Sequence, residues 1–309
     1  MSYKTTLAAL SAAVLAVACQ SATEPLPSDP PVAFAAGGAK TTSPTGESST
    51  AWSDATGRER FRPEYHGGPV MHGTSAVYLI WYGNWTGNTA TAILTDLVSN
   101  LGSSSYFRAV TKYPDASGSA PSGGLIYAGA ISDGYSHGPS LTKADVATIV
   151  RTSVESGQLP FDLAAVYAVL ISADVTVGGA FSGYCAYHDS TPLSGYPIEY
   201  VLVGNPQRAP TSCGPPIQQF IGPNDNLGAD GMASLLAAVL ANTVTDPTLT
   251  SWYDRNGLEM ADKCAWTYGT TYVSANGTLA NVRLGQRDYL LQQLWVPSKN
   301  GGACALSTP

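Results

Sequence analysis

The stretch from residue 225 to 247 reads DNLGADGMASLLAAVLANTVTDP, and it organises the rest of the chain. Asp225 and Asn226 can each cap the start of a helix. The apolar residues that follow fall on nearly every side of a helix, which is the pattern of a buried helix. Pro247 ends it, because its ring cannot continue a helix and disfavours the α conformation in the residue before it. The sequence therefore predicts a central core helix over residues 228–245.

The composition is typical of an exported protein. The chain has 309 residues, and only 12% of them are charged, about half the usual share of a soluble domain. The net charge is −7 and the isoelectric point is near 5.0. Nucleic acid and anionic membranes need a basic face, so this balance argues against both as partners.

The N-terminus resembles an export signal. Lys4 supplies a positive charge, and residues 7–17 form an apolar run too short to span a bilayer. Two interpretations compete for the cleavage site. Residues 16–18 form an A-x-A site for plain secretion, whereas small residues before Cys19 resemble a lipobox whose cysteine becomes acylated. We favour the lipoprotein, and predict a signal peptide over residues 1–18.

Residues 19–60 are rich in Ser, Thr, Pro, Gly and Ala and have few large apolar side chains. Such a segment cannot offset its loss of entropy on ordering. We predict a disordered tether over residues 19–60, and a single folded domain over residues 61–309.

The cysteine count fits an oxidising compartment. Without Cys19, an even number remains, which indicates two disulfides. The four are Cys185, Cys213, Cys264 and Cys304. Of three possible pairings, proximity in sequence favours 185 with 213 and 264 with 304. A four-cysteine zinc site is disfavoured, because no C-x-x-C pair is present.

Strand-like and helix-like segments alternate along the domain. Near-continuous apolar runs over residues 76–83, 165–173 and 198–203 predict strands buried on both faces. Apolar residues at helical spacing predict helices over residues 90–101 and 140–157. Shorter strand-like pieces lie at 108–113 and 124–131, and residues 288–296 fit either a strand or a helix. This alternation predicts an α/β fold, a mixed sheet flanked by helices around the buried central helix.

An ordered set of short motifs resembles the EXORDIUM, or phosphate-induced (PHI), protein family. The set covers nearly all of the chain after Phe61. Its members are Tyr65-His66-Gly67-Gly68-Pro69-Val70-Met71, Val77-Tyr78-Leu79-Ile80-Trp81-Tyr82-Gly83-Asn84-Trp85, Ser140-Leu141-Thr142, Ser172-Ala173-Asp174-Val175, Cys185-Ala186-Tyr187-His188, Val203-Gly204-Asn205, Asp230-Gly231-Met232, residues 240–247 and the tail near Trp295.

The resemblance implies an extracellular protein with no firmly attached biochemical activity. It also implies a zincin-like fold, because some members resemble zinc peptidases and carry His-Glu-x-x-Glu on the central helix. Residues i and i+4 share a helix face and can bind one metal, while the glutamate at i+1 acts on the bound water.

In this chain the corresponding helix positions are Ala238, Val239 and Asn242. Alanine and valine offer no lone pair, and asparagine is a poor zinc ligand. The downstream Glu-x-x-Asp is kept as Glu259 and Asp262. Ordinary zincin hydrolysis is therefore not expected, and we expect no metal.

Two histidines complete the candidate site. His66 and His188 could converge with Glu259, Asp262 and Asn242 in a different metal or acid–base site. The alternative, which we favour, is that each histidine satisfies a local hydrogen bond, because neither has ligand spacing.

Two functional hypotheses follow. The first is an exported, lipid-anchored, non-catalytic binding or signalling domain, whose ligand at the envelope or outside the cell is a glycan or a peptide. The alternative is a metal-dependent hydrolase, related to zincin peptidases, that uses zinc and an altered ligand set.

Overall fold

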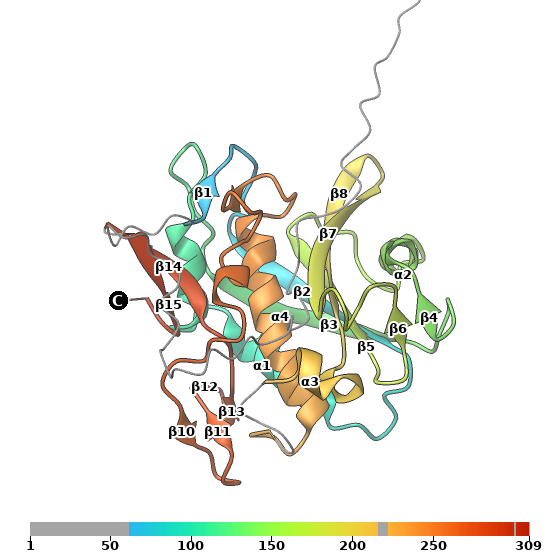
Figure 1. Cartoon of the computed structure of the whole chain (residues 1–309). Coiled ribbons are helices and arrows are strands. Elements are labelled where there is room, and N and C mark those ends of the chain that lie inside the picture. Colours follow the sequence, from blue (N-terminus) through green and yellow to red (C-terminus); the bar gives the residue numbers. More distant parts are fainter. Residues whose placement is uncertain (1–61, 216–221, 300, 309) are drawn as a thin grey trace, which may run out of the picture.

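The structure is a computed structural model that describes residues 62–215, 222–299 and 301–308. The predicted signal peptide, the tether and the acylated Cys19 lie outside the described residues. Figure 1 shows a sheet with helices on both sides and a C-terminal region packed against the central helix. The chain is thus a mixed α/β fold, as the alternating pattern predicts.

The main sheet has five strands in the order β3-β2-β5-β8-β7. Four of them are parallel, and β7 at one edge runs antiparallel to β8. The strands are β2 (Thr74–Tyr82), β3 (Gly124–Asp133), β5 (Ala165–Ile171), β7 (Ala186–Leu193) and β8 (Tyr196–Val203). Every residue of β5 is buried, as expected for a central strand covered on both faces.

Three helices cover the sheet. α1 (Ala90–Leu101) and α4 (Leu227–Thr245) pack on one face, and α2 (Lys143–Glu155) packs on the other. Each strand contributes side chains to the cores on both faces of the sheet, because successive side chains point to opposite faces. In β2, Leu79 joins the core under α1 and α4, whereas Ile80 joins the core under α2.

The central helix α4 is buried on all sides, as its sequence predicts. Asn226 caps its start by accepting a hydrogen bond from the backbone N–H of Ala229 at 3.0 Å, and the helix ends at Thr245, before Asp246 and Pro247. It is long and apolar enough to cross a membrane by composition alone, but 94% of its 18-residue window is buried inside the protein. It is the core helix of the domain.

The C-terminal region explains why α4 is apolar all round. The sheet covers one side of the helix, and residues such as Met260, Leu291 and Leu294 cover another. This region is built from three pairs of short strands: β10 (Tyr272–Val273) with β11 (Leu279–Ala280), β12 (Val282–Leu284) with β13 (Arg287–Tyr289), and β14 (Leu294–Ser298) with β15 (Gly301–Ala305). Two further pairs involve earlier parts of the described chain: β1 (Glu64–Tyr65) with β9 (Trp252–Tyr253), and β4 (Ser140–Leu141) with β6 (Thr176–Val177).

Two disulfides link segments that are distant in the sequence. One joins Cys185, just before β7, to Cys213 in the short helix α3 (Pro210–Cys213). The other joins Cys264 to Cys304 in β15. These are the pairings that proximity in sequence favours.

One local prediction is wrong, and one strand is missing from the sequence analysis. Residues 108–113 were expected to be strand-like, but Phe107–Lys112 forms a 3-10 helix because Phe107 and Val110 turn into the core beside α4. The strand β7 was not predicted at all. Its antiparallel partner β8 and the turn at Ser194 and Gly195, both with positive φ, hold it in the sheet.

Candidate functional site

The predicted site residues His188 and Glu259 form a buried pair. The Nε2 atom of His188 lies 3.0 Å and 2.9 Å from the two carboxylate oxygens of Glu259. Their side chains are 1% and 2% exposed. The two oxygens share one Nε2–H in a bifurcated hydrogen bond, and with His188 protonated this bond is charge-assisted and stronger than a neutral one.

The strand β7 positions His188. Alternation along β7 places Ala186 and His188 on the face that α4 covers, whereas Tyr187 points to the α2 side. In Figure 1, β7 runs beside α4 at the edge of the sheet. His188 therefore faces the central helix from the antiparallel edge strand.

A turn fastened to α4 positions Glu259. The Oδ1 atom of Asn242 on α4 accepts a hydrogen bond from the backbone N–H of Ala261 at 2.9 Å. The Oδ2 atom of Asp262 accepts one from the backbone N–H of Glu259 at 3.2 Å. Asn242 and Asp262 thus lie with His188 and Glu259 in one region, and both hold the backbone that carries Glu259.

Two more buried carboxyl groups surround the pair. Asp246 at the end of α4 accepts hydrogen bonds from the backbone N–H groups of Thr250 and Ser251, both at 2.7 Å. Glu199 lies on β8, one strand from His188, and is 6% exposed. Among the described residues, Nδ1 of His188, Oδ2 of Asp246 and Oε2 of Glu199 have no hydrogen-bond partner. His188, Glu259, Asp246 and Glu199 thus form a buried cluster with three carboxyl groups, and His188 is the member that can carry a positive charge.

The electrostatics favour a protonated His188. Burial alone would lower its pKa, but the charge and hydrogen bond of Glu259, with Asp246 and Asp262, outweigh burial and raise it to about 9. Burial raises the pKa of Glu259 and that of Asp246, and His188 opposes both shifts. Burial also raises the pKa of Glu199, to about 8. At neutral pH the cluster therefore contains a buried imidazolium paired with Glu259.

A zinc ion does not fit these residues. Ala238 and Val239 offer no lone pair, and the Oδ1 atom of Asn242 is occupied by the Ala261 N–H. The described part of the chain holds no group of three or more His, Cys, Asp or Glu side chains arranged to bind a metal ion. Nothing supports the metal-dependent hydrolase with an altered ligand set.

His66 lies apart from the cluster. It is exposed on the loop after β1, and its ring stacks on Tyr253 with centroids 3.8 Å apart. Its Nε2 atom lies 3.0 Å from the backbone oxygen of Tyr253. The structure gives His66 the local contact that was the alternative to a ligand role.

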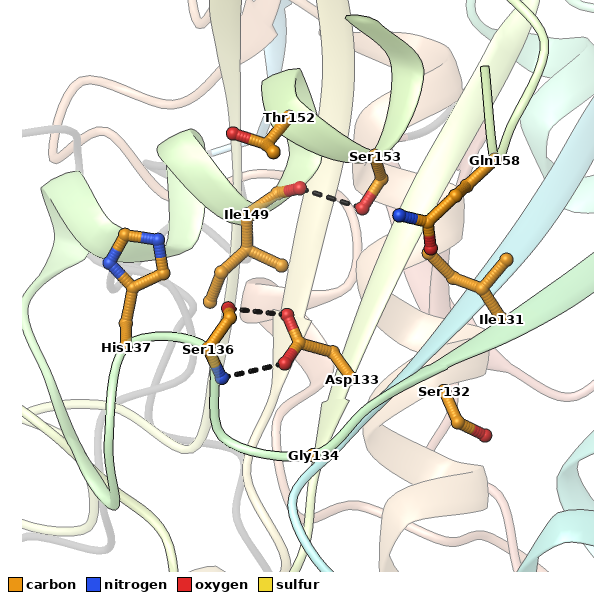
Figure 2. Close-up of a pocket in the computed structure, with 10 residues that line it drawn as sticks. All are labelled: Ile131, Ser132, Asp133, Gly134, Ser136, His137, Ile149, Thr152, Ser153 and Gln158. Carbon is orange, nitrogen blue, oxygen red and sulfur yellow. Dashed lines mark hydrogen bonds between the residues drawn. The ribbon is translucent and has the colours of Figure 1, made fainter. Parts of the chain in front are cut away.

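A pocket of about 370 Å³ lies elsewhere, between the end of β3 and helix α2 (Figure 2). Both carboxylate oxygens of Asp133 accept hydrogen bonds from Ser136, one from its N–H and one from its hydroxyl, at 2.8 and 2.6 Å. From the opposite wall, Figure 2 shows the side chains of Ser153 and Gln158 directed towards the same space.

Sequence reasoning missed this pocket and the strand that carries His188. The Ser194-Gly195 dipeptide between two strand-length runs is a hairpin signal that could have revealed β7. The pocket had no comparable signal, because its residues come from the separate segments 131–137 and 149–158. They meet only when α2 packs on the sheet.

Comparison with known proteins assigns the family. The model of the family described as phosphate-induced protein 1 conserved region matches residues 64–305. Protein EXORDIUM-like 3 of Arabidopsis thaliana is 30% identical over 270 residues, which cover 76% of this chain and 80% of the relative. Protein PHOSPHATE-INDUCED 1 of Nicotiana tabacum is 28% identical over 283 residues, covering 76% of this chain and 85% of the relative. No solved structure matches the chain significantly. With a matching family model over most of its length, the chain belongs to the phosphate-induced protein 1, or EXORDIUM, family.

Proposed function

We propose that this protein is an exported, non-catalytic binding domain that works without a metal at the cell envelope or outside the cell. One observation carries the proposal. The residues that could perform chemistry, His188 and Glu259, are paired with each other and 1% and 2% exposed. A general base must come within hydrogen-bond reach of a substrate proton, and neither group is open to one.

Export is supported by the cysteines. Both disulfides fit an oxidising compartment, and the N-terminal sequence has the pattern of a signal peptide. Acylation of Cys19 is part of the proposal, because small residues precede a cysteine at the cleavage junction. The lipid would then hold the domain at the cell envelope.

A zincin-like fold is also part of the proposal. It is supported by a mixed sheet whose antiparallel edge strand β7 lies beside the buried helix α4. It is also supported by Glu259, which lies after α4 in the chain, in the turn that Asn242 of α4 holds. In this chain His188 pairs with Glu259 in that region. In this proposal the His188–Glu259 pair stabilises the fold and performs no reaction. The ligand, a glycan or a peptide, binds elsewhere.

A cleavage assay tests this proposal. The purified protein is incubated with equimolar zinc and a mixture of unstructured peptides, and products are followed by mass spectrometry. Wild type and the Glu259→Gln variant, checked for folding by circular dichroism, should both give only the buffer background. Products formed by wild type and lost in Glu259→Gln would show that hydrolysis requires Glu259 and would overturn the proposal.

A further inference from the structure

The strand β3 leaves its outer edge open beyond its start, where the backbone of Gly102 lies against that of Leu125. Within the residues that the structure describes, no strand pairs with the outer side of β3 (Gly124–Asp133). Residues 124–132 include no charged residue and no proline, which are two of the devices by which proteins block an edge. Ile126 on this strand is 53% exposed. Such an edge offers backbone N–H and C=O groups to another extended chain.

A bulge directs the side chains of β3. The register with β2 shifts between Val77 and Tyr78, so that Ala128 is the extra residue on β3. Ile126 lies opposite Ala76, and beyond the bulge Ile131 and Asp133 lie opposite Ile80 and Tyr82. Those three β2 residues all belong to the core under α2. Ile126, Ile131 and Asp133 therefore share the α2 face, on both sides of the bulge.

The pocket continues this face at the carboxyl end of the strand. Ile131, Ser132 and Asp133 form one wall, and Ile149, Thr152 and Ser153 of α2 form the opposite one (Figure 2). Its volume of about 370 Å³ lies within the range of ligand pockets, roughly 300–1,000 Å³. A chain lying along β3 would reach it within one strand length.

The charge of the pocket favours a cation. Its ten lining residues include Asp133 and no lysine or arginine. The one basic side chain, His137, lies with its Nδ1 atom 3.4 Å from Asp145. Asp133 accepts two hydrogen bonds from Ser136, and a carboxylate has about four lone-pair sites. It can therefore accept further bonds from an ammonium or guanidinium group.

We propose that β3 docks an extended peptide as an added strand and that the pocket takes a lysine or arginine side chain of that peptide beside Asp133. The unpaired backbone ladder selects an extended chain, and the uncharged edge accepts small or apolar side chains. A second copy of this protein is disfavoured, because each copy carries a net charge of −7. This inference rests on the proposed function, since it names the ligand of a domain that binds and does not cleave.

The test uses a defined probe and the full purified protein. The probe is an acetylated, fluorescein-labelled decapeptide in which valine and threonine alternate, with one lysine near the unlabelled end. A matched probe carries norleucine in place of lysine. Binding is measured by fluorescence anisotropy for wild type, Asp133→Asn, Ile126→Lys and the control Glu155→Gln, which alters an exposed acid of α2 outside the pocket. Melting curves confirm that each variant is folded.

The lysine probe should bind wild type and Glu155→Gln equally and saturably. Asp133→Asn, Ile126→Lys and the norleucine probe should each weaken binding about tenfold or more, and hydrogen exchange should slow on β3 when the probe is added. Absence of saturable binding to wild type, or equal binding by Asp133→Asn, would overturn the inference. So would a dimer that Ile126→Lys converts to a monomer, because the edge would then serve a second copy.

The same experiment separates this inference from the proposed function. Cleavage of the probe, seen by mass spectrometry, would overturn the non-catalytic proposal. A probe that is neither bound nor cleaved would overturn only the docking strand.

Discussion

Replacing Glu259 with alanine should destabilise the protein by about 3–5 kcal/mol, because it leaves the imidazolium of His188 buried without a partner. The two side chains are 1% and 2% exposed, and Nε2 of His188 lies 2.9 and 3.0 Å from the two carboxylate oxygens of Glu259. Solvent therefore cannot replace the lost carboxylate. The measurement is the free energy of unfolding in urea at pH 7.

A double-mutant cycle separates the pair from its surroundings. His188→Met and Glu259→Met should each cost several kcal/mol, whereas the double variant should cost less than their sum by about 2 kcal/mol or more. Glu64→Met is the matched control, because its carboxylate pairs with Arg62 at 3.5 Å in an exposed position. It should change stability by about 0.5 kcal/mol or less. Additive effects at positions 188 and 259 would contradict a coupled pair.

Stability should fall as pH rises from 5 to 9, and His188 alone should account for about 3 kcal/mol of the fall. The pKa of His188 is raised to about 9, so its contribution is fully present below the unfolded value near 6.5 and is lost as pH rises through 9. Burial raises the pKa of Glu199 to about 8 and that of Asp230 to about 6. Between pH 5 and 9 the native state therefore binds more protons than the unfolded state, and the slope is negative.

Urea unfolding at pH 5, 7 and 9 checks this sign. Glu199→Gln should flatten the slope between pH 5 and 8, and His188→Gln should flatten it above pH 7, since each removes one titrating group. Partly exposed carboxylates such as Asp145, whose pKa is lowered by hydrogen bonds from Thr142, act only at more acidic pH. Stability that rises towards pH 9 would contradict the assignment of a buried, protonated cluster.

Regular, strongly patterned elements could be predicted from the sequence. The apolar run that became α4 and the runs that became β2, β5 and β8 are each buried over almost their whole length. A residue pattern reports burial well when one environment extends along the whole element. The helices α1 and α2 carried clear apolar stripes for the same reason.

Elements stabilised by tertiary contacts could not be predicted. The strand β7 contains His188, Asp189 and Pro192, which weaken an apolar pattern. The histidine is tolerated in the core because Glu259, 71 residues away, neutralises it, and the proline is tolerated because β7 is an edge strand. Residues 288–296 fitted a strand or a helix. They contain strand at both ends, the end of β13 and the start of β14, joined by residues 290–293 without regular secondary structure.

The candidate site likewise includes residues that the sequence indicated and contacts that it could not indicate. Glu259, Asp262 and Asn242 came from a resemblance, and the structure joins them through hydrogen bonds to one turn. His66 shares the family motif but stacks on Tyr253 outside the cluster. Whether isolated histidines converge depends on packing between distant segments, which spacing in the sequence does not encode.

The central claim is that His188 and Glu259 form a closed pair, meaning that they are buried, bind each other and bind no metal. The metal content of the purified protein tests this claim most directly. Elemental mass spectrometry would be applied to wild type, Glu259→Ala and, as a control at the histidine outside the cluster, His66→Ala. We expect less than about 0.1 zinc per chain in all three, because Ala238 and Val239 supply no ligand and Asn242 is occupied. Stoichiometric zinc in wild type that is lost in Glu259→Ala and kept in His66→Ala would contradict the closed pair.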